Sequence, residues 1–475
     1  MKPDATPFPL EPLTALSSID GRYRDAVAPL VEHLSEYALI KNRVKVECEY
    51  LVALSRQKGS GTRSFTDAEI ALIREIENVS LQDAQLVKRI EKEGYGDIPA
   101  TNHDVKAVEY FIKDKLRGTS LEDVSERVHF ALTSEDTNSI AYGLMLRDCL
   151  EEVVLDATNN VLLGLESLAK THAATPLLAR THGQPASPTT FGKEMRVFVE
   201  RLRRQIQQVE KNPILVKLGG ATGNFNAHLA AMPDIDWREF SRDFITGLSR
   251  DTDVDHAIAL ELNEFTTQIE PHDTYAELCD SMRRINTILI DCSQDMWRYI
   301  SDGLVVQRPK AGEVGSSTMP HKVNPIDFEN AEGNFGVANA LFEHFARKLP
   351  ISRLQRDLSD STVLRVFGTA FGHSMIGYKS LLRGLGKISV NADAMKEDLA
   401  AHPEVLAEAI QTVLRHYGIQ NAYERLKDLT RGRAVTMEII TDFIQSLPLE
   451  DDVKRRLQEM TPESYIGLSA EIARK

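Results

Sequence analysis

The chain has 475 residues, of which 42% are apolar and 27% charged, and its formal net charge is −14. That length suits roughly two to four domains or one large elongated core. The acidic balance argues against a general nucleic-acid or anionic-membrane surface, because both need a basic face. A few local Arg and Lys residues would still suffice to bind a small anionic ligand.

The first part of the chain, residues 1–122, has the periodicity of short helices. Apolar spacing predicts helices over 35–56, over 66–78, and from about 102–104 to Lys115. Thr66 with Glu69 three residues later is a capping box, which fixes the start of the second of these helices.

Long apolar stripes at alternating three- and four-residue steps come next. They run over 150–168, 191–209, 275–299, 328–349 and, more loosely, 363–388. Each predicts a helix well above the mean length of about 11–12 residues. Such helices form long bundles. Apolar residues also flank the stripes, so we expect the bundle to pack against bundles of other subunits.

The last part of the chain, 387–475, is a series of short helices interrupted by Gly and Pro. We therefore predict an all-α fold with three helical domains, over 1–122, 123–386 and 387–475.

Polar segments interrupt the long helices and are richer in functional side chains than a connector needs. There are four such segments, Thr101-Asn102-His103-Asp104, Thr133-Ser134-Glu135-Asp136, 180–186 and 310–325. The first two of them also fit ordinary helix caps, with Asn, Asp, Thr or Ser as the capping residue.

The third and fourth polar segments have two interpretations each. His182, beside Gly183, is either a surface residue or a general acid or base. Residues 310–325 contain Gly, Pro and small hydroxyls that suit a closing lid, and a disordered linker has the same composition. The Gly-rich segment 217–228 lacks a P-loop ending and a preceding strand, so we interpret it as a tight turn near the site.

The cysteines suggest a reducing compartment. Cys48, Cys149, Cys279 and Cys292 form no C-x-x-C pair and no zinc-like cluster. The N-terminal residues lack the apolar run of a signal peptide, and no stretch approaches about 18 uninterrupted apolar residues. We therefore expect free thiols and a cytoplasmic protein.

Residues 315–324, Gly-Ser-Ser-Thr-Met-Pro-His-Lys-Val-Asn, resemble the signature of the fumarase/aspartase superfamily of fumarate-forming lyases. The segments 20–23, 101–104, 133–136 and 181–186 resemble the adenylosuccinate lyase branch of that superfamily. The resemblance covers roughly residues 13–470. It implies a homotetramer with a twenty-helix core, active sites shared by three subunits, and no metal or organic cofactor.

The resemblance also implies an anti β-elimination that splits adenylosuccinate into AMP and fumarate, and a similar cleavage of succinylaminoimidazole carboxamide ribotide. Ser316 resembles the base, and the adjacent Ser317 is an alternative. Lys322 and Asn324 would hold the aci-carboxylate, and His182 resembles the general acid.

The remaining implied site residues bind the substrate. His103 would orient it, and arginine forks suit its phosphate, although the segment 353–365 also fits a solvated helix start. The implied substrate contacts are Arg22, Tyr23, Asn102, Asp104, Thr133, Ser134, Gln268, Asn330, Arg356, Ser361, Thr362 and Arg365.

Two alternatives remain. Another fumarate-forming lyase, such as argininosuccinate lyase or aspartase, is disfavoured by Gly-Gln-Pro-Ala after His182 and by the Arg-rich segment 353–365. A non-catalytic structural protein on the same scaffold is disfavoured because the residues implied for catalysis are all present, namely Ser316, His182, His103 and Lys322.

Overall fold

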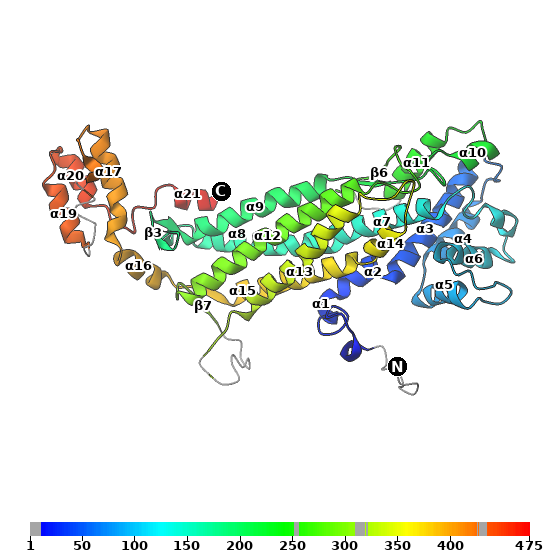
Figure 1. Ribbon diagram of the computed structural model, residues 1–475, viewed down its shortest axis with the longest axis horizontal. Helices are drawn as coiled ribbons and strands as arrows, with labels where there is room; N and C mark the ends of the chain where they lie inside the picture. Colours follow the sequence, from blue (N-terminus) through cyan, green and yellow to red (C-terminus); the bar gives the residue numbers. More distant parts are fainter. Residues whose placement is uncertain (1–10, 251–255, 309–318, 320–321, 425, 427–434) are drawn as a thin grey trace. The chain divides into compact units, whose positions relative to one another are not determined.

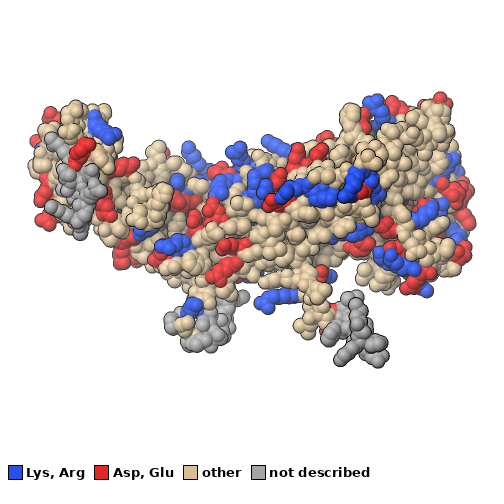
Figure 2. Space-filling model, in the orientation of Figure 1, with Lys and Arg blue, Asp and Glu red and all other residues tan. Residues whose placement is uncertain are grey.

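The computed structural model describes residues 11–250, 256–308, 319, 322–424, 426 and 435–475, and these are mostly helical (Figure 1). The strands have only two or three residues each. The all-α prediction is therefore confirmed. Acidic and basic side chains are interspersed on the face seen in Figure 2. None of the helices in the described ranges combines the length and apolarity that a membrane crossing requires.

The chain divides into two compact units, and each is described by itself. The first unit holds the described residues of 1–158, 204–287 and 333–379. Its helices are α1 (Arg24–Val27), α2 (Val31–Leu34), α3 (Glu36–Arg56), α4 (Asp67–Glu77), α5 (Leu81–Lys92), α6 (Asp104–Leu116), α7 (Ser134–Cys149), α10 (Asn226–Ala231), α11 (Trp237–Arg250) and α14 (Ser359–Leu364). It also contains the 3₁₀ turns Pro12–Thr14, Ala28–Leu30 and Glu122–Arg127. Its two strands, β5 (Ile214–Val216) and β6 (Leu260–Leu262), pair in parallel.

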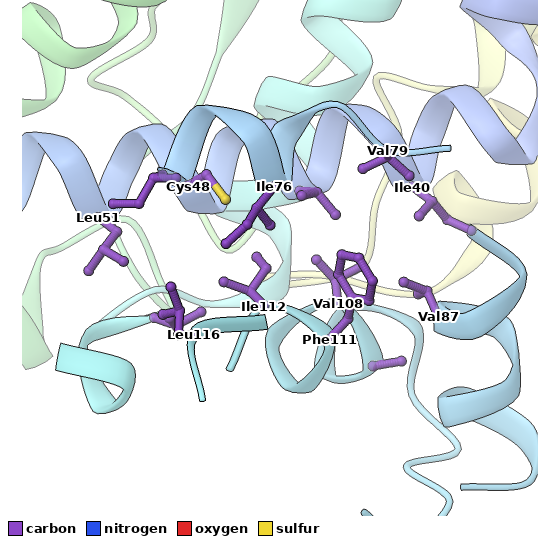
Figure 3. Close-up of a cluster of buried hydrophobic side chains, with 14 of the residues drawn as sticks. Ile40, Cys48, Leu51, Ile76, Val79, Val87, Val108, Phe111, Ile112 and Leu116 are labelled. Atoms are coloured by element: carbon purple, nitrogen blue, oxygen red, sulfur yellow. The ribbon is translucent and has the colours of Figure 1, made fainter. Parts of the chain in front are cut away.

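Helices α3 to α6 share one apolar core. Ser35 caps α3, and Thr66 and Glu69 form the predicted box at the start of α4. Figure 3 shows Val108 and Phe111 of α6 among side chains of α3, α4 and α5, and all of these residues are buried. The predicted helices 35–56 and 66–78 are confirmed, whereas α5 was not among the predictions.

Helix α7 corrects the prediction for the stripe over 150–168. The helix begins at Ser134, passes through a π-helical segment, Leu150–Val154, and continues as α8 (Leu155–Thr171). Nearly every α7 residue is buried, so the helix has no single apolar stripe to reveal it. Inserted π turns are frequent near functional sites, and here Glu151 accepts a hydrogen bond from the Ile258 N–H at 2.7 Å.

The stripes over 191–209, 275–299 and 328–349 are confirmed, whereas the looser stripe over 363–388 is divided between α14 and α15. The long helices are α8, α9 (Phe191–Lys211), α12 (Asp273–Ser301), α13 (Ile326–Lys348) and α15 (Phe367–Lys387). Along α12 the stripe residues from Tyr275 to Met296 are at most 2% exposed, and those of α13 from Phe328 to Phe345 at most 1%. The chain passes from one unit to the other within these helices.

The second unit holds the described residues of 159–203, 288–332 and 380–475. Its strands form three antiparallel pairs: β1 (Pro176–Leu177) with β4 (Thr189–Thr190), β2 (Arg180–Thr181) with β3 (Gln184–Pro185), and β7 (Val305–Gln307) with β8 (Ile388–Val390). Its shorter helices are α16 (Ala392–Ala400), the 3₁₀ turn Pro403–Leu406, α17 (Ala407–His416), α19 (Met437–Gln445), α20 (Asp451–Gln458) and α21 (Ser469–Arg474). Leu406, Ile410 and Ile440 belong to a small core that α17, α19 and α20 share. The predicted boundaries of three domains stay a prediction.

Candidate functional site

The start of α6 presents His103. Asn102 has a left-handed backbone (φ 50°), and the His103 Nδ1 accepts the Lys106 N–H at 3.3 Å. The cap is therefore His103, not the expected Asn or Asp, since Asp104 turns toward two arginines. Using Nδ1 for the cap leaves the other ring nitrogen of this half-exposed side chain for a ligand.

Asp104 joins two arginines of the first unit. Its Oδ2 lies 2.9 Å from the Nη2 of the buried Arg43 and 2.9 Å from the Nη2 of Arg365. Burial raises the pKa of Asp104, but the charge of Arg43, the Val105 N–H and Arg365 outweigh it and lower the pKa to about 2. The carboxylate is thus ionised at neutral pH and holds Arg365 in one orientation.

The start of α7 is fixed by a buried ion pair. The Asp136 Oδ1 lies 2.6 Å from the Lys217 Nζ, and both side chains are fully buried. The same carboxylate accepts N–H groups of Thr133 at 2.8 Å, Gly219 at 2.8 Å and Gly220 at 3.1 Å. The Gly-rich segment therefore lies against the residues that carry the Thr133 and Ser134 hydroxyls.

Glu135 ties α7 to the arginine-rich segment. Its carboxylate lies 2.8 Å from the Arg356 Nη2 and accepts the Asn138 amide at 2.6 Å. Burial raises the pKa of Glu135, although Arg356 and Asn138 oppose that shift. Arg356 is thereby held beside the start of α7.

Gln268 lies on a loop that two neighbouring segments hold. Its Nε2 donates to the Ala221 carbonyl at 3.1 Å, and its N–H donates to the Gln355 carbonyl at 3.3 Å. Within the loop, the buried Glu270 accepts the Asn263 amide at 2.8 Å and the N–H of His272 at 2.5 Å. Burial raises the pKa of Glu270 to about 7.

A cavity of about 310 Å³ joins Arg365 to the N-terminal segment, with Asp20, Arg24 and Glu36 also on its wall. Next to that wall, the Arg22 guanidinium lies 5.9 Å from the centre of the Tyr23 ring. The Arg365 Nη1 donates to the Ser361 carbonyl at 3.2 Å and to the Ser361 hydroxyl, whereas Thr362 is exposed.

In the second unit, His182 lies at the tip of a tight hairpin. Thr181 pairs with Gln184, so His182 and Gly183 form a two-residue loop, and both have left-handed backbones (φ 54° and 76°). This is the sign pattern of a type I′ turn. An ion pair of Arg180 with Asp398 at 2.8 Å anchors one strand, and His182 is exposed.

Lys322, Asn324 and Asn330 also belong to the second unit. The Lys322 N–H donates to the Met319 carbonyl at 3.0 Å, and the Lys322 side chain is exposed. The Asn330 Oδ1 accepts the Ser380 hydroxyl at 2.8 Å. The two serines predicted as alternative bases, Ser316 and Ser317, lie outside the described residues.

The structure thus brings the 102–104, 133–135, 268, 356 and 361–365 segments of the first unit together through a continuous set of contacts. Sequence reasoning missed three residues of that set, Arg43, Asn138 and Lys217. The sequence did contain a sign of Arg43, because this charged residue lies between the apolar positions Ile40 and Val44 of a helix that the apolar spacing predicts to be buried. Among the described residues no cluster of His, Cys, Asp and Glu has the form of a metal site.

Comparison with known families matches two parts of the chain. Residues 21–338 match a family model described as "Lyase", and residues 352–466 match one described as "Adenylosuccinate lyase C-terminal". Relatives named "Adenylosuccinate lyase" are 48% identical in Haemophilus influenzae (98% of this chain, 99% of the relative) and 48% identical in Escherichia coli K12 (96% and 97%). One from Dictyostelium discoideum is 49% identical, over 98% of both chains.

Solved structures share the fold at lower identity. A fumarate lyase from Mesorhizobium sp. BNC1 superposes with a TM-score of 0.71 at 17% identity, covering 94% of this chain and 96% of the other. A 3-carboxy-cis,cis-muconate lactonizing enzyme from Pseudomonas putida gives 0.67 at 20% identity, with 94% and 95% covered.

Proposed function

The chain belongs to the adenylosuccinate lyase family, and from that premise we propose that it splits adenylosuccinate into AMP and fumarate. The observation that carries the proposal is 48% identity over 98% of the chain with a relative of that name. Succinylaminoimidazole carboxamide ribotide is the proposed second substrate, because it presents the same succinylamino group and ribose phosphate.

The proposed reaction is an anti β-elimination. Ser316 removes a proton from the succinyl carbon next to a carboxylate, and the electron pair moves into that carboxylate as a doubly negative aci-carboxylate. The electron pair then forms the fumarate double bond while the carbon–nitrogen bond breaks. Serine is a weak base in water, so this step needs a closed site with fixed positive charge.

Lys322 and Asn324 are the proposed donors to the aci-carboxylate. His182 protonates the leaving purine nitrogen, which leaves with the electron pair of the broken bond. His103 binds and orients the substrate through the ring nitrogen that does not cap α6. The proposal for His103 is supported by its exposure and by its cap, which fixes the plane of the ring.

Arg365 and Ser361 are proposed to bind the 5′-phosphate together with Arg22 and Tyr23. The fixed guanidinium of Arg365, beside Asp104, supports this assignment, because a fork held in one orientation binds phosphate at a lower entropic cost. The other proposed substrate contacts are Asn102, Asp104, Thr133, Ser134, Gln268, Asn330, Arg356 and Thr362.

A homotetramer with active sites shared by three subunits is the proposed assembly. Large apolar side chains on the long helices support it, because they are 39% to 60% exposed in the single chain. They are Leu163, Val197, Trp297, Ile326, Val337 and Leu382. Light scattering should give four times the chain mass, and a monomer that retains full activity would contradict this proposal.

A cytoplasmic location is also proposed. It is supported by Cys48, Cys149, Cys279 and Cys292, which are all free and buried. Four thiols should react with a thiol reagent after unfolding without reductant, and a disulfide among them would contradict the proposal.

The function is tested by ultraviolet absorbance of adenylosuccinate mixed with the purified chain. Wild type should convert adenylosuccinate to AMP and fumarate, and Ser316→Ala should lose at least about 100-fold in kcat. Faster turnover of argininosuccinate or aspartate than of adenylosuccinate would contradict the assigned substrate. Absence of any lyase activity in an assembled tetramer would favour a structural protein instead.

A further inference from the structure

Arg43 is a buried charge on α3, whose buried side chains are mostly apolar but also include Glu47 and Glu49. It is 1% exposed, and its neighbours in the α3 stripe, Ile40 and Val44, are buried in the core of α3 to α6. Burying a guanidinium carries a large desolvation cost, and an apolar side chain of similar size would often pack there at least as well. Retaining the charge therefore indicates a use beyond packing.

The hydrogen bonds of Arg43 go to two different parts of the candidate site. Its Nη2 donates to the Asp104 Oδ2 at 2.9 Å, and its Nε donates to the Asn138 Oδ1 at 2.8 Å. Its Nη1 has no hydrogen-bond partner among the described residues. One guanidinium thus contacts the start of α6 and the first turns of α7.

Each of these contacts ends on an arginine proposed to bind the substrate. On one side, Asp104 holds the Arg365 Nη2 at 2.9 Å. On the other side, the Asn138 amide donates to Glu135 at 2.6 Å, and Glu135 holds the Arg356 Nη2 at 2.8 Å. Arg43 lies between two carboxylates that fix two anion-binding groups: its charge lowers the pKa of Asp104, and its bond to the Asn138 oxygen orients the amide that donates to Glu135.

We propose that Arg43 is a positioning residue that sets the orientation of Arg365 and Arg356 through Asp104 and the Asn138–Glu135 pair, without touching the substrate. The inference rests on the proposed function, because it assigns Arg43 to the substrate-binding half of that site. It predicts that Arg43 acts mainly on KM, since both of its branches end on arginines that are proposed to bind the substrate and not to transfer a proton.

The test is a double-mutant cycle between Arg43→Gln and Arg365→Gln, with KM and kcat for adenylosuccinate as the readouts. Arg43→Gln should raise KM about 10- to 100-fold, the range for one lost charge-assisted contact, and change kcat less than about threefold. In the Arg365→Gln background the same substitution should raise KM by a clearly smaller factor, because the branch through Asp104 has lost its target and only the branch to Arg356 remains.

The matched control is Arg147→Gln. Arg147 is also 1% exposed in the first unit, and it bonds to its neighbour Asp148 at 2.8 Å. Both single variants should lower Tm, but Arg147→Gln should leave KM unchanged. An additive effect of Arg43→Gln on KM in both backgrounds, or a KM change matched by Arg147→Gln, would overturn the inference.

A second variant covers loss of folding. Arg43→Lys keeps the charge but has one ammonium to serve both Asp104 and Asn138, so it should fold and give a KM between wild type and Arg43→Gln. If Arg43→Gln does not fold, the cycle is run with Arg43→Lys, and a wild-type KM in that variant would overturn the inference. If the wild-type chain does not turn over adenylosuccinate, the proposed function is contradicted instead. The double-mutant cycle would then use the Kd for AMP as its readout in place of KM.

Discussion

The starts of α6 and α7 and the hairpin that carries His182 are constructed in opposite ways. At the starts of α6 and α7, the arginines are held by carboxylates that are themselves buried or bridged, as Asp104 holds Arg365. The hairpin places His182 and Gly183 in an exposed two-residue turn, fixed from one strand by the Arg180–Asp398 ion pair. One region is rigid through buried charge and the other through backbone geometry.

In the proposed function, this difference separates substrate binding from proton transfer. Binding a doubly charged phosphate favours arginines whose orientation is fixed before the ligand arrives. A general acid must instead reach the leaving nitrogen, and the exposed turn leaves the proposed acid, His182, accessible. A chain with this construction should hold part of its affinity alone and acquire its catalytic rate when the site is completed.

Replacing His182, the proposed general acid, should have the largest effect. We expect His182→Gln to lower kcat by about 10²- to 10⁴-fold, the range for a lost general acid, with Tm unchanged because the side chain is exposed. Steady-state kinetics with adenylosuccinate measures this. His402→Gln is the control in the same unit, since its ring pairs with Glu404 at 2.8 Å and lies outside the proposed site. A similar loss of kcat in both variants would contradict the proposed role of His182 as the general acid.

Breaking the buried ion pair should have the next largest effect. Lys217→Met leaves the Asp136 carboxylate buried without its counter-ion, and this should lower the free energy of unfolding by about 3–5 kcal/mol. Urea unfolding measures the change. The double variant Asp136→Leu with Lys217→Met should be less damaged than Lys217→Met alone, and equal damage would show that the ion pair does not fix the start of α7.

Arg365→Lys tests whether the fork is needed and not only the charge. Because an ammonium cannot bond to Asp104, Ser361 and a phosphate in the same geometry, we expect KM to rise about tenfold with little change in kcat. Arg353→Lys in the same segment is the control, since its side chain is 83% exposed and pairs with Asp357. An unchanged KM for Arg365→Lys would contradict a phosphate role.

The last expected effect depends on pH. Burial raises the pKa of Glu270 from about 4.5 to about 7, so between these values the folded state holds a proton that the unfolded state has lost. The free energy of unfolding therefore falls as pH rises through this window, by up to about 3 kcal/mol. Glu270→Gln removes the titration, so its stability relative to wild type should increase between pH 5 and pH 8. If urea unfolding gives the same difference in free energy of unfolding between Glu270→Gln and wild type at pH 5 and pH 8, the raised pKa of Glu270 is contradicted.

The sequence sufficed for features that depend on local pattern. The α12 stripe from Tyr275 to Met296 could be predicted because every third or fourth residue is apolar, and the capping box at Thr66 because its partner is three residues away. The contacts that build the site join distant residues. Asp136 and Lys217 are 81 positions apart and Asp104 and Arg365 are 261 apart, and no local pattern links such pairs.

The same limit explains His103. A cap by Asn or Asp is the usual expectation, but the arginines on Asp104 take its carboxylate, and Asn102, with a left-handed backbone, precedes the cap position. Only tertiary contacts decide which of the neighbouring polar residues caps α6.

The central proposal, that each active site is shared between subunits, is tested most directly by mixing two variants. His103→Gln, in the first unit, and His182→Gln, in the second, should each be nearly inactive alone. When the two are dissociated, mixed and reassembled, some sites combine two wild-type histidines from different chains, and adenylosuccinate turnover should return. If the mixture remains as inactive as either variant, both histidines come from the same chain and the account is wrong.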